Sequence, residues 1–293
     1  MRIIFDDAGD VPADQIEEYG LVMIPVNVTF GTEQFLSSVD MFHDDFYQKV
    51  KTVGAHNFPK TSQPTPFQFE ELFRKLIDQG DKEFLTIVVS EKLSGTYASA
   101  EAAARELAGQ ATFHLYDSEF GSAPQGLMAM EAARMHAAGA DYAAIKERLD
   151  EMKREMAVYF LIDSLEYAVK GGRVSALRST MASLLNIKPI MMMKNGVIDE
   201  AAKVRTYKKA LSTMIELTKS EVGDRPVALA VIHAGAPEAG QSLLELARQH
   251  FNIVEEYLVD MAIAVAINLG PGDRKSTRLN SSHSQQSRMP SSA

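Results

Sequence analysis

Short apolar runs alternate with longer stretches of mixed polarity along the first half of the chain. The apolar runs have the length and the β-branched content of buried strands, and they cover residues 2–5, 21–30, 84–89 and 111–116. Helices are predicted between and after these runs, because residues typical of helix ends flank each stretch. Strands that alternate with helices indicate a parallel sheet covered by helices. We therefore predict that residues 1–155 form a parallel-sheet α/β/α sandwich.

The second half of the chain has a different pattern. Asn195 and Gly196 separate two short runs, at residues 189–193 and 197–203, and this dipeptide is a strong signal for a tight hairpin. Such an antiparallel pair indicates a mixed sheet. Further strands are predicted at residues 158–162, 227–232, 253–259 and 262–267. We therefore predict a second, mixed-sheet α/β domain over residues 156–272.

The composition changes abruptly after residue 272. Residues 273–293 contain almost no apolar side chains and show no periodicity, which predicts a disordered segment. The stretch DRKSTRLNSSH, at residues 273–283, also matches the translation of a common sequencing-adapter DNA. We therefore expect this tail to be a non-native artefact that replaces the true C-terminus, and it is excluded from the functional argument.

Composition narrows the class of protein. The 293 residues are 46% hydrophobic, which is typical of a globular chain, and no apolar run is long enough to span a membrane. The net charge of −9 argues against nucleic acid as a partner. The absence of cysteine excludes disulfides and thiolate chemistry. Because the N-terminus also lacks the apolar core of a signal peptide, we expect a cytoplasmic protein.

Two loops rich in hydroxyl groups form the main candidate site. Ser94, Gly95 and Thr96 stand between a predicted strand and an alanine-rich helix. The first N–H groups of a helix are unpaired and favour an anion; the alternative is that Ser94 or Thr96 is an ordinary helix cap. Thr61 and Ser62 lie in the second loop. They precede the predicted cap of the next helix, so capping does not account for them.

Metal binding and catalysis are rival hypotheses. Asp6, Asp7 and Asp10 follow the first strand, where turn and capping roles are the favoured interpretation and a metal site is the alternative. Ser94 as a nucleophile would need His233 or His114 as its base. The chain has no G-x-S-x-G motif, no Walker loop and no histidine pair with zinc-ligand spacing.

Six collinear stretches resemble motifs of the DegV family, bacterial fatty-acid-binding proteins that supply a fatty acid kinase. They are KTSQPTP (60–66), KLSGTYASA (92–100), LEYAVKGGRV (165–174), SLLNIKPI (183–190), KVRTYKKAL (203–211) and GPG (270–272). Together they span nearly all of residues 1–272. The resemblance implies two α/β domains with a ligand between them, in which the second sheet carries its helices on one side.

The resemblance also implies a function. The protein would be a carrier and not an enzyme, without a cofactor, that presents the carboxylate of a bound long-chain fatty acid to a separate ATP-dependent kinase for phospholipid synthesis. The carboxylate would be held mainly by Thr61 and Ser94. The residues implied to lie close by are Ser62, Gly95 and Thr96. Arg173, the arginine of the GGR motif, would contact the head group or the kinase.

Two places depart from the family pattern. Asn268 stands two residues before GPG, where the family has histidine; asparagine still donates a hydrogen bond to a carboxylate but carries no charge. We include Asn268 in the predicted carboxylate site. In the opening DDAGDV, Asp7 and Ala8 replace a serine and a threonine.

The acyl tail would gain about 0.8 kcal/mol for each buried CH₂. Candidate lining residues are Met181, Met191, Met192 and Met193, because methionine adapts to chains of varied shape; ordinary core packing is the favoured alternative for most of them. Two other functions stay open at this point. One is a serine-dependent acyl hydrolase, and the other is a binder of a small polar or phosphorylated ligand, which would need a short polar pocket.

Overall fold

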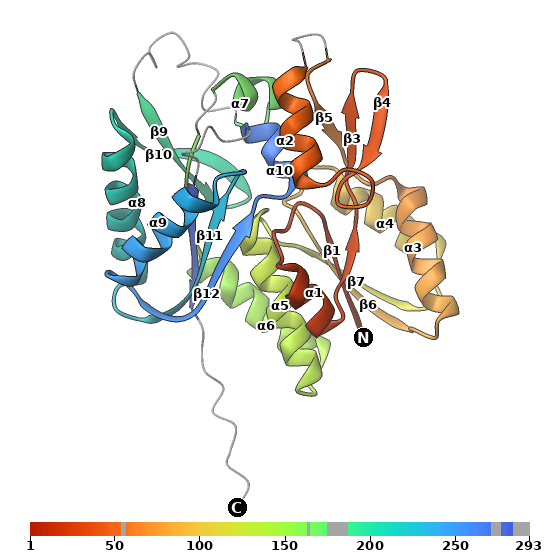
Figure 1. The fold of residues 1–293 in the computed structure, drawn as a ribbon. Coiled ribbons are helices and arrows are strands. Elements are labelled where there is room, and N and C mark those ends of the chain that lie inside the picture. The colour runs from red at the N-terminus through yellow and green to blue at the C-terminus, as the bar shows by residue number, and fades with distance from the viewer. Residues whose placement is uncertain (54–56, 163–164, 175–186, 271–276, 284–293) are drawn as a thin grey trace, which may run out of the picture.

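The computed structural model describes residues 1–53, 57–162, 165–174, 187–270 and 277–283. Its first part is built on a parallel sheet with the strand order β2-β1-β6-β7 (Figure 1). The strands are β1 (Arg2–Asp6), β2 (Val22–Ile24), β6 (Glu83–Val88) and β7 (Thr112–Asp117). The two central strands, β1 and β6, are almost fully buried because helices cover both faces of the sheet.

The helices of this part form the two outer layers of the predicted sandwich. On one face lie α3 (Pro66–Asp78) and α4 (Thr96–Glu106). On the other face lie α1 (Ala13–Tyr19), α5 (Ala123–Ala137) and α6 (Tyr142–Glu155). Thr65 caps α3 as the sequence predicts, because its hydroxyl accepts a hydrogen bond from the N–H of Gln68 at 3.2 Å.

A small antiparallel sheet stands beside this sandwich and was not predicted. Its strands have the order β4-β3-β5. Along the chain, helix α2 lies between β4 and β5. These elements are β3 (Asn27–Phe30), β4 (Glu33–Leu36), α2 (His43–Thr52) and β5 (Lys60–Ser62). The single strand predicted at residues 21–30 is therefore wrong. Pro25 has no N–H for a ladder, and the chain leaves the parallel sheet there and enters the small one.

The second domain is a mixed sheet with the order β10-β9-β8-β13-β11-β12, in which only β11 and β12 are parallel among the described pairs. Its strands are β8 (Ala157–Leu161), β9 (Lys188–Lys194), β10 (Val197–Val204), β11 (Pro226–His233), β12 (Asn252–Asp260) and β13 (Thr277–His283). Helices α8 (Tyr207–Val222) and α9 (Pro237–Arg248) cover one face, as implied. The predicted hairpin is confirmed, with positive φ at Asn195 and Gly196.

Two short helices complete the second domain, and one corrects the sequence prediction. They are α7 (Leu165–Gly171) and α10 (Ile263–Leu269), which pack against each other at the upper end of the molecule in Figure 1. Residues 262–267 were predicted as a strand. Five of the seven residues of α10 are buried, so no polar face reveals the helical period, and a short apolar run is ambiguous between helix and strand.

The prediction of a disordered tail is wrong for β13. This strand lies between β8 and β11, antiparallel to both, in the middle of the mixed sheet. Ladder hydrogen bonds come from the backbone and place little demand on sequence, so a polar composition does not prevent the pairing. The rest of the tail, residues 273–276 and 284–293, lies outside the described residues. The proposed domain boundaries and the foreign origin of the tail stay predictions.

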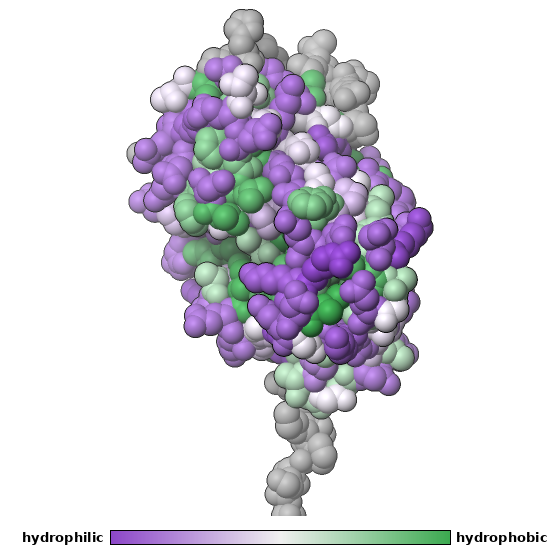
Figure 2. Space-filling model, turned by 90° about the vertical axis from the view of Figure 1, so that its right-hand side faces the viewer, coloured by the Kyte–Doolittle hydropathy of each residue, from purple (hydrophilic) through white to green (hydrophobic). Residues whose placement is uncertain are grey.

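One apolar core joins the two domains. It combines Phe5 and Ile87 from the parallel sheet with Phe160 and Met191 from the mixed sheet. On the face seen from the side of α3 and α4, hydrophilic residues cover most of the surface, with smaller hydrophobic areas between them (Figure 2). Within the described part of the chain, no helix has the length and hydrophobicity needed to cross a membrane.

Candidate functional site

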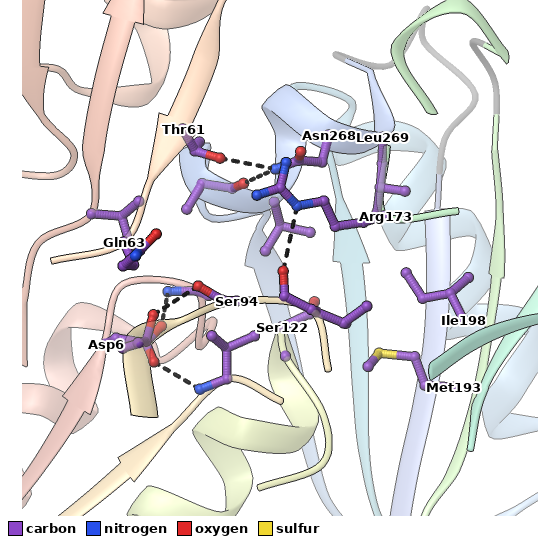
Figure 3. A pocket seen from close by; sticks show the side chains of 18 of the residues that line it. Asp6, Thr61, Gln63, Ser94, Ser122, Arg173, Met193, Ile198, Asn268 and Leu269 are labelled. Atoms are coloured by element: carbon purple, nitrogen blue, oxygen red, sulfur yellow. Dashed lines mark hydrogen bonds between the residues drawn. The ribbon is translucent and has the colours of Figure 1, made fainter. Parts of the chain in front are cut away.

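A cleft of about 840 Å³, part of it open to solvent, lies where the two domains meet. The ends of β1 and β6 and the strand β5 line it from one side, and α10 and the face of β8, β9 and β10 line it from the other. Most lining side chains are apolar. The polar ones gather at one end, where Thr61, Asn268 and Arg173 point toward one another, whereas Met193 and Ile198 lie farther along (Figure 3).

The amide of Asn268 and the hydroxyl of Thr61 connect the two domains at the polar end. Nδ2 of Asn268 donates to Thr61 Oγ1 at 3.3 Å and to the Ala264 carbonyl at 2.8 Å. Both amide hydrogens are thereby used, and the proton of the Thr61 hydroxyl is left to donate to a ligand. Gly171 permits this contact between α7 and α10, because a Cβ there would stand 2.9 Å from the Asn268 side chain.

Ser94, in the loop between β6 and α4, and Thr96, the first residue of α4, both line the cleft. Their hydroxyl oxygens are 2.9 Å apart, and Thr96 is buried. The helix cap is Gly95, and no side chain bonds to the N–H groups there, so the interpretation of Ser94 or Thr96 as a cap is wrong. One of these hydroxyls donates to the other, so the pair leaves one hydroxyl proton to donate to a ligand at the start of α4.

The other predicted residues lie at or near the same opening. Ser62 lines the cleft, but Gly95 does not; a Cβ on Gly95 would come within 2.9 Å of the Gln63 amide, and Gln63 itself lines the cleft. Arg173 is exposed, and its guanidinium donates to the Gly171 carbonyl at 2.7 Å and to the Leu93 carbonyl at 3.4 Å. It is the one cation among the described lining residues.

The acidic cluster organises the loops around the cleft. Asp6 accepts hydrogen bonds from the N–H groups of Ala8 at 2.9 Å and Val89 at 2.7 Å. Asp10 accepts from the N–H of Ala262 at 2.5 Å and from the Ser122 hydroxyl. These contacts agree with the favoured turn and capping role. Among the described residues, no group of three or more potential ligands is arranged to hold a metal.

Burial changes the protonation of two of these carboxyls. It raises the pKa of Asp6 to about 6 and that of Asp7 to about 7, against hydrogen bonds that favour the charged forms. Asp7, the carboxylate that departs from the family pattern, does not line the cleft. It accepts the Ser38 hydroxyl instead, at 3.1 Å.

Sequence reasoning missed several lining residues. Asp6 and Ser122 both face the cleft, and Ser122 has a φ of 61°, a strained value for serine that local sequence does not reveal. Val158, Phe160 and Ile198 supply apolar lining from strands whose facing side follows only from the packed fold. The apolar run of β8 predicts a strand there, but a run without alternation does not show which side chains face the cleft.

The methionine predictions divide. Met193 lines the cleft, Met191 is fully buried in the core and lines no described cavity, and Met192 lines a second opening. Met181 lies outside the described residues. Core packing therefore accounts for Met191, as the favoured alternative predicts.

No histidine is placed to activate Ser94 among the residues that line the cleft. His114 contacts Glu83 at 3.0 Å and stacks on Tyr142, on the outer part of the parallel sheet. His233 lies 3.4 Å from Asp260 at the end of β11. Neither lines the cleft.

Comparisons with known proteins point to one family. The family model described as "Uncharacterised protein, DegV family" matches residues 1–273. A DegV domain-containing protein of Halalkalibacterium halodurans is 33% identical over 273 residues, which are 93% of this chain and 95% of that protein. Protein DegV of Bacillus subtilis is 32% identical over 275 residues, 93% of this chain and 96% of that protein.

Solved structures show the same architecture. The structure of Bacillus subtilis DegV, described as a fatty acid binding protein, has a TM-score of 0.84 and 29% identity, and the match covers 97% of this chain and 99% of that one. A Thermotoga maritima protein for which a fatty acid binding function is reported has a TM-score of 0.85 and 27% identity, with 97% and 99% covered. The chain therefore belongs to the DegV family.

Proposed function

We propose that this protein binds a free long-chain fatty acid in the cleft and presents its carboxylate to a separate ATP-dependent kinase. The observation that carries the proposal is the division of the cleft into a cluster of hydrogen-bond donors at one end and mostly apolar side chains along the rest. The fatty acid binding named for two structural relatives supports it. The setting we propose is the cytoplasm.

The carboxylate would lie among Thr61, Ser94 and Thr96. Hydrogen bonds from hydroxyls to a charged group contribute about 1.5–3 kcal/mol each, and the start of α4 adds its dipole. Asn268 orients Thr61 through its amide. Arg173, exposed at the mouth, is placed to meet the carboxylate on its outer side or the kinase that approaches it.

A direct test is to purify the protein, extract it with organic solvent and identify the extract by mass spectrometry. We expect a stoichiometric acyl chain, or tight binding of added fatty acid, and Thr61→Val should weaken that binding about tenfold or more. Ser242 is exposed on α9, so Ser242→Ala is the matched hydroxyl control, and this variant should bind the fatty acid as the wild type does. If neither the purified nor the supplemented protein holds a fatty acid, the proposal fails.

The kinase half is tested separately with a fatty acid kinase and ATP. Arg173→Ala should retain the fatty acid but support slower formation of the acyl phosphate. Equal rates for both proteins would contradict the role proposed for Arg173. Release of free acid from an acyl ester, lost in Ser94→Ala, would instead support the hydrolase alternative. The mostly apolar lining argues against a small phosphorylated ligand.

A further inference from the structure

Two cavities in this protein share a wall. Besides the cleft, a second opening of about 1100 Å³, including the solvent that it admits, lies between the end of α6 and the β9–β10 hairpin. Val158 and Met193 line both cavities, and no other described residue does. Both side chains are buried, at 5% and 8% exposure of the residue. They therefore separate the cleft from the second opening.

The sheet register explains how this wall forms. Ile198 of β10 is the ladder partner of Met193 on β9. On the other side of β9, Met192 pairs with Tyr159 of β8, so Val158 is the next residue along β8 beside Met193. Since side chains alternate between the faces of a sheet, the three side chains form one row across three strands, on the face toward the first domain.

The chemistry changes sharply across this row. The cleft side is mostly apolar, whereas the second opening contains Glu119, Lys153 and Lys194, with Lys153 Nζ 3.4 Å from Glu119 Oε1. A methylene chain that passed the row would enter a charged, solvated space and would gain nothing from burial. The row therefore marks the end of the apolar path that begins at Thr61.

Met193 is the adaptable member of the row. Valine and isoleucine are branched at Cβ and stiff, whereas methionine has three side-chain torsions and fills irregular space. We propose that Met193 closes the tail end of the cleft and sets the length of the acyl chain that it accepts. This inference rests on the proposed function, because it assumes that a fatty acid lies in the cleft.

The proposal predicts opposite shifts for two substitutions. Met193→Ala vacates the space of the methionine side chain within the row, so chains longer by the few CH₂ groups that fill this space should bind more tightly than in the wild type, by about fourfold for each of them. Met193→Phe fills the same space with a rigid ring and should shift the preference toward shorter chains. Binding of chains shorter than the optimum should change little in Met193→Ala.

The experiment measures dissociation constants for a homologous series of saturated, straight-chain fatty acids. Met191→Ala is the matched control: it makes the same change on the same face of β9, two residues away, at a fully buried residue that lines neither cavity. The expected result is a shifted length profile in both Met193 variants and an unchanged profile in Met191→Ala.

The other outcomes distinguish a failure of this inference from a failure of the proposed function. If the wild type binds fatty acids but both Met193 variants keep its length profile, the inference is overturned while the proposed function stands. The same holds if Met191→Ala shifts the profile as much as Met193→Ala, because the effect is then a general loosening of the core. If Met193→Ala does not fold, Met193→Phe alone decides, through the presence or absence of the shift to shorter chains. A wild type that binds no fatty acid removes both proposals.

Discussion

Asn268 holds Thr61 in place with an uncharged amide. At pH values where imidazole is protonated, Asn268→His would add a cationic donor beside the carboxylate, and charge-assisted hydrogen bonds are roughly twice as strong as neutral ones. We expect fatty acid binding to tighten by about 1 kcal/mol, or about fivefold, at about pH 6, and less at about pH 8.

Titration calorimetry or a fluorescent fatty acid measures this affinity. Asn252→His, at the exposed start of β12, is the control for a histidine elsewhere on the surface and should leave binding unchanged. Unchanged or weaker binding by Asn268→His at both pH values would mean that Asn268 does not face the head group.

Asp7 gives a pH dependence to stability. Its pKa is raised to about 7 by burial, from an ordinary value of 3.8, so the folded state binds the proton more tightly than the unfolded chain. Protonation therefore stabilises the fold; the contribution is complete below the unfolded pKa and is lost as the pH rises through about 7. Asp7→Asn is neutral at every pH and keeps an oxygen that accepts the Ser38 hydroxyl.

We expect wild-type resistance to urea to fall between about pH 5 and about pH 7.5, and the fall to be smaller in Asp7→Asn by on the order of 2 kcal/mol. Asp14→Asn, exposed on α1, should retain the wild-type slope. Identical slopes for wild type and Asp7→Asn would show that Asp7 stays ionised throughout.

For single residues, the sequence predicts a role where that role depends on neighbours in the chain or on a family motif. Thr61, Ser94 and Asn268 were predicted through the family resemblance, and the structure brings them to one cleft. Asp6 and Ser122 were not predicted as lining residues. Their position depends on strands and loops that are distant in sequence. At Ser122, which has a positive φ, the hydroxyl donates to the Asp10 carboxylate and the backbone N–H donates to the Ala8 carbonyl.

Among the elements, α10 is anchored to the first domain by a buried hydrogen bond at its start, in addition to the bond between Asn268 and Thr61. The Asp10 carboxylate accepts the N–H of Ala262, the residue that precedes the helix, and α10 then carries Asn268 to the cleft. Asp10→Ala leaves the Ala262 N–H and the Ser122 hydroxyl without that acceptor. An unpaired buried donor costs about 1–3 kcal/mol, so we expect a net loss of about 2 kcal/mol.

Amide hydrogen exchange should locate this loss. We expect faster exchange in α10 and weaker fatty acid binding in Asp10→Ala, with little change in the distant helix α9. Asp14→Ala removes an exposed carboxylate nearby in sequence and should change neither property. Exchange in α10 at the wild-type rate would show that Asp10 does not anchor the helix.

The same helix shows which elements can be predicted. The β9–β10 hairpin follows from the Asn195–Gly196 dipeptide alone, because the turn requires positive φ at both residues. By contrast, α10 is short and buried on most sides, so its apolar run carries no period. The small sheet was missed because its strands are only three or four residues long, and because β5 pairs with β3 from a distant part of the chain.

For the whole molecule, the order of the strands in each sheet is the property that the pattern of apolar and polar residues does not predict. Alternation of strands and helices predicts the parallel sheet and the mixed sheet, but pairing between distant strands is set by global packing. The insertion of β13 between β8 and β11 is the clearest case. A polar segment that composition assigns to disorder becomes a central strand because two neighbouring strands each offer it an unpaired backbone edge.

This arrangement predicts a strong effect of truncation. Without residues 273–293, β11 loses its partner from Val227 to His233 and β8 loses its partner from Ala157 to Phe160. Both edges lie in the middle of the sheet, and buried backbone groups without partners are costly. Since native domains are stable by only about 5–15 kcal/mol, we expect the second domain to lose its cooperative fold, as seen by circular dichroism and gel filtration.

A chain that ends at residue 283 keeps β13 and is the control. If the chain that ends at residue 272 unfolds at the same temperature as this control, the pairing of β13 contributes nothing to the fold, and the segment is better explained as a foreign addition with no structural role.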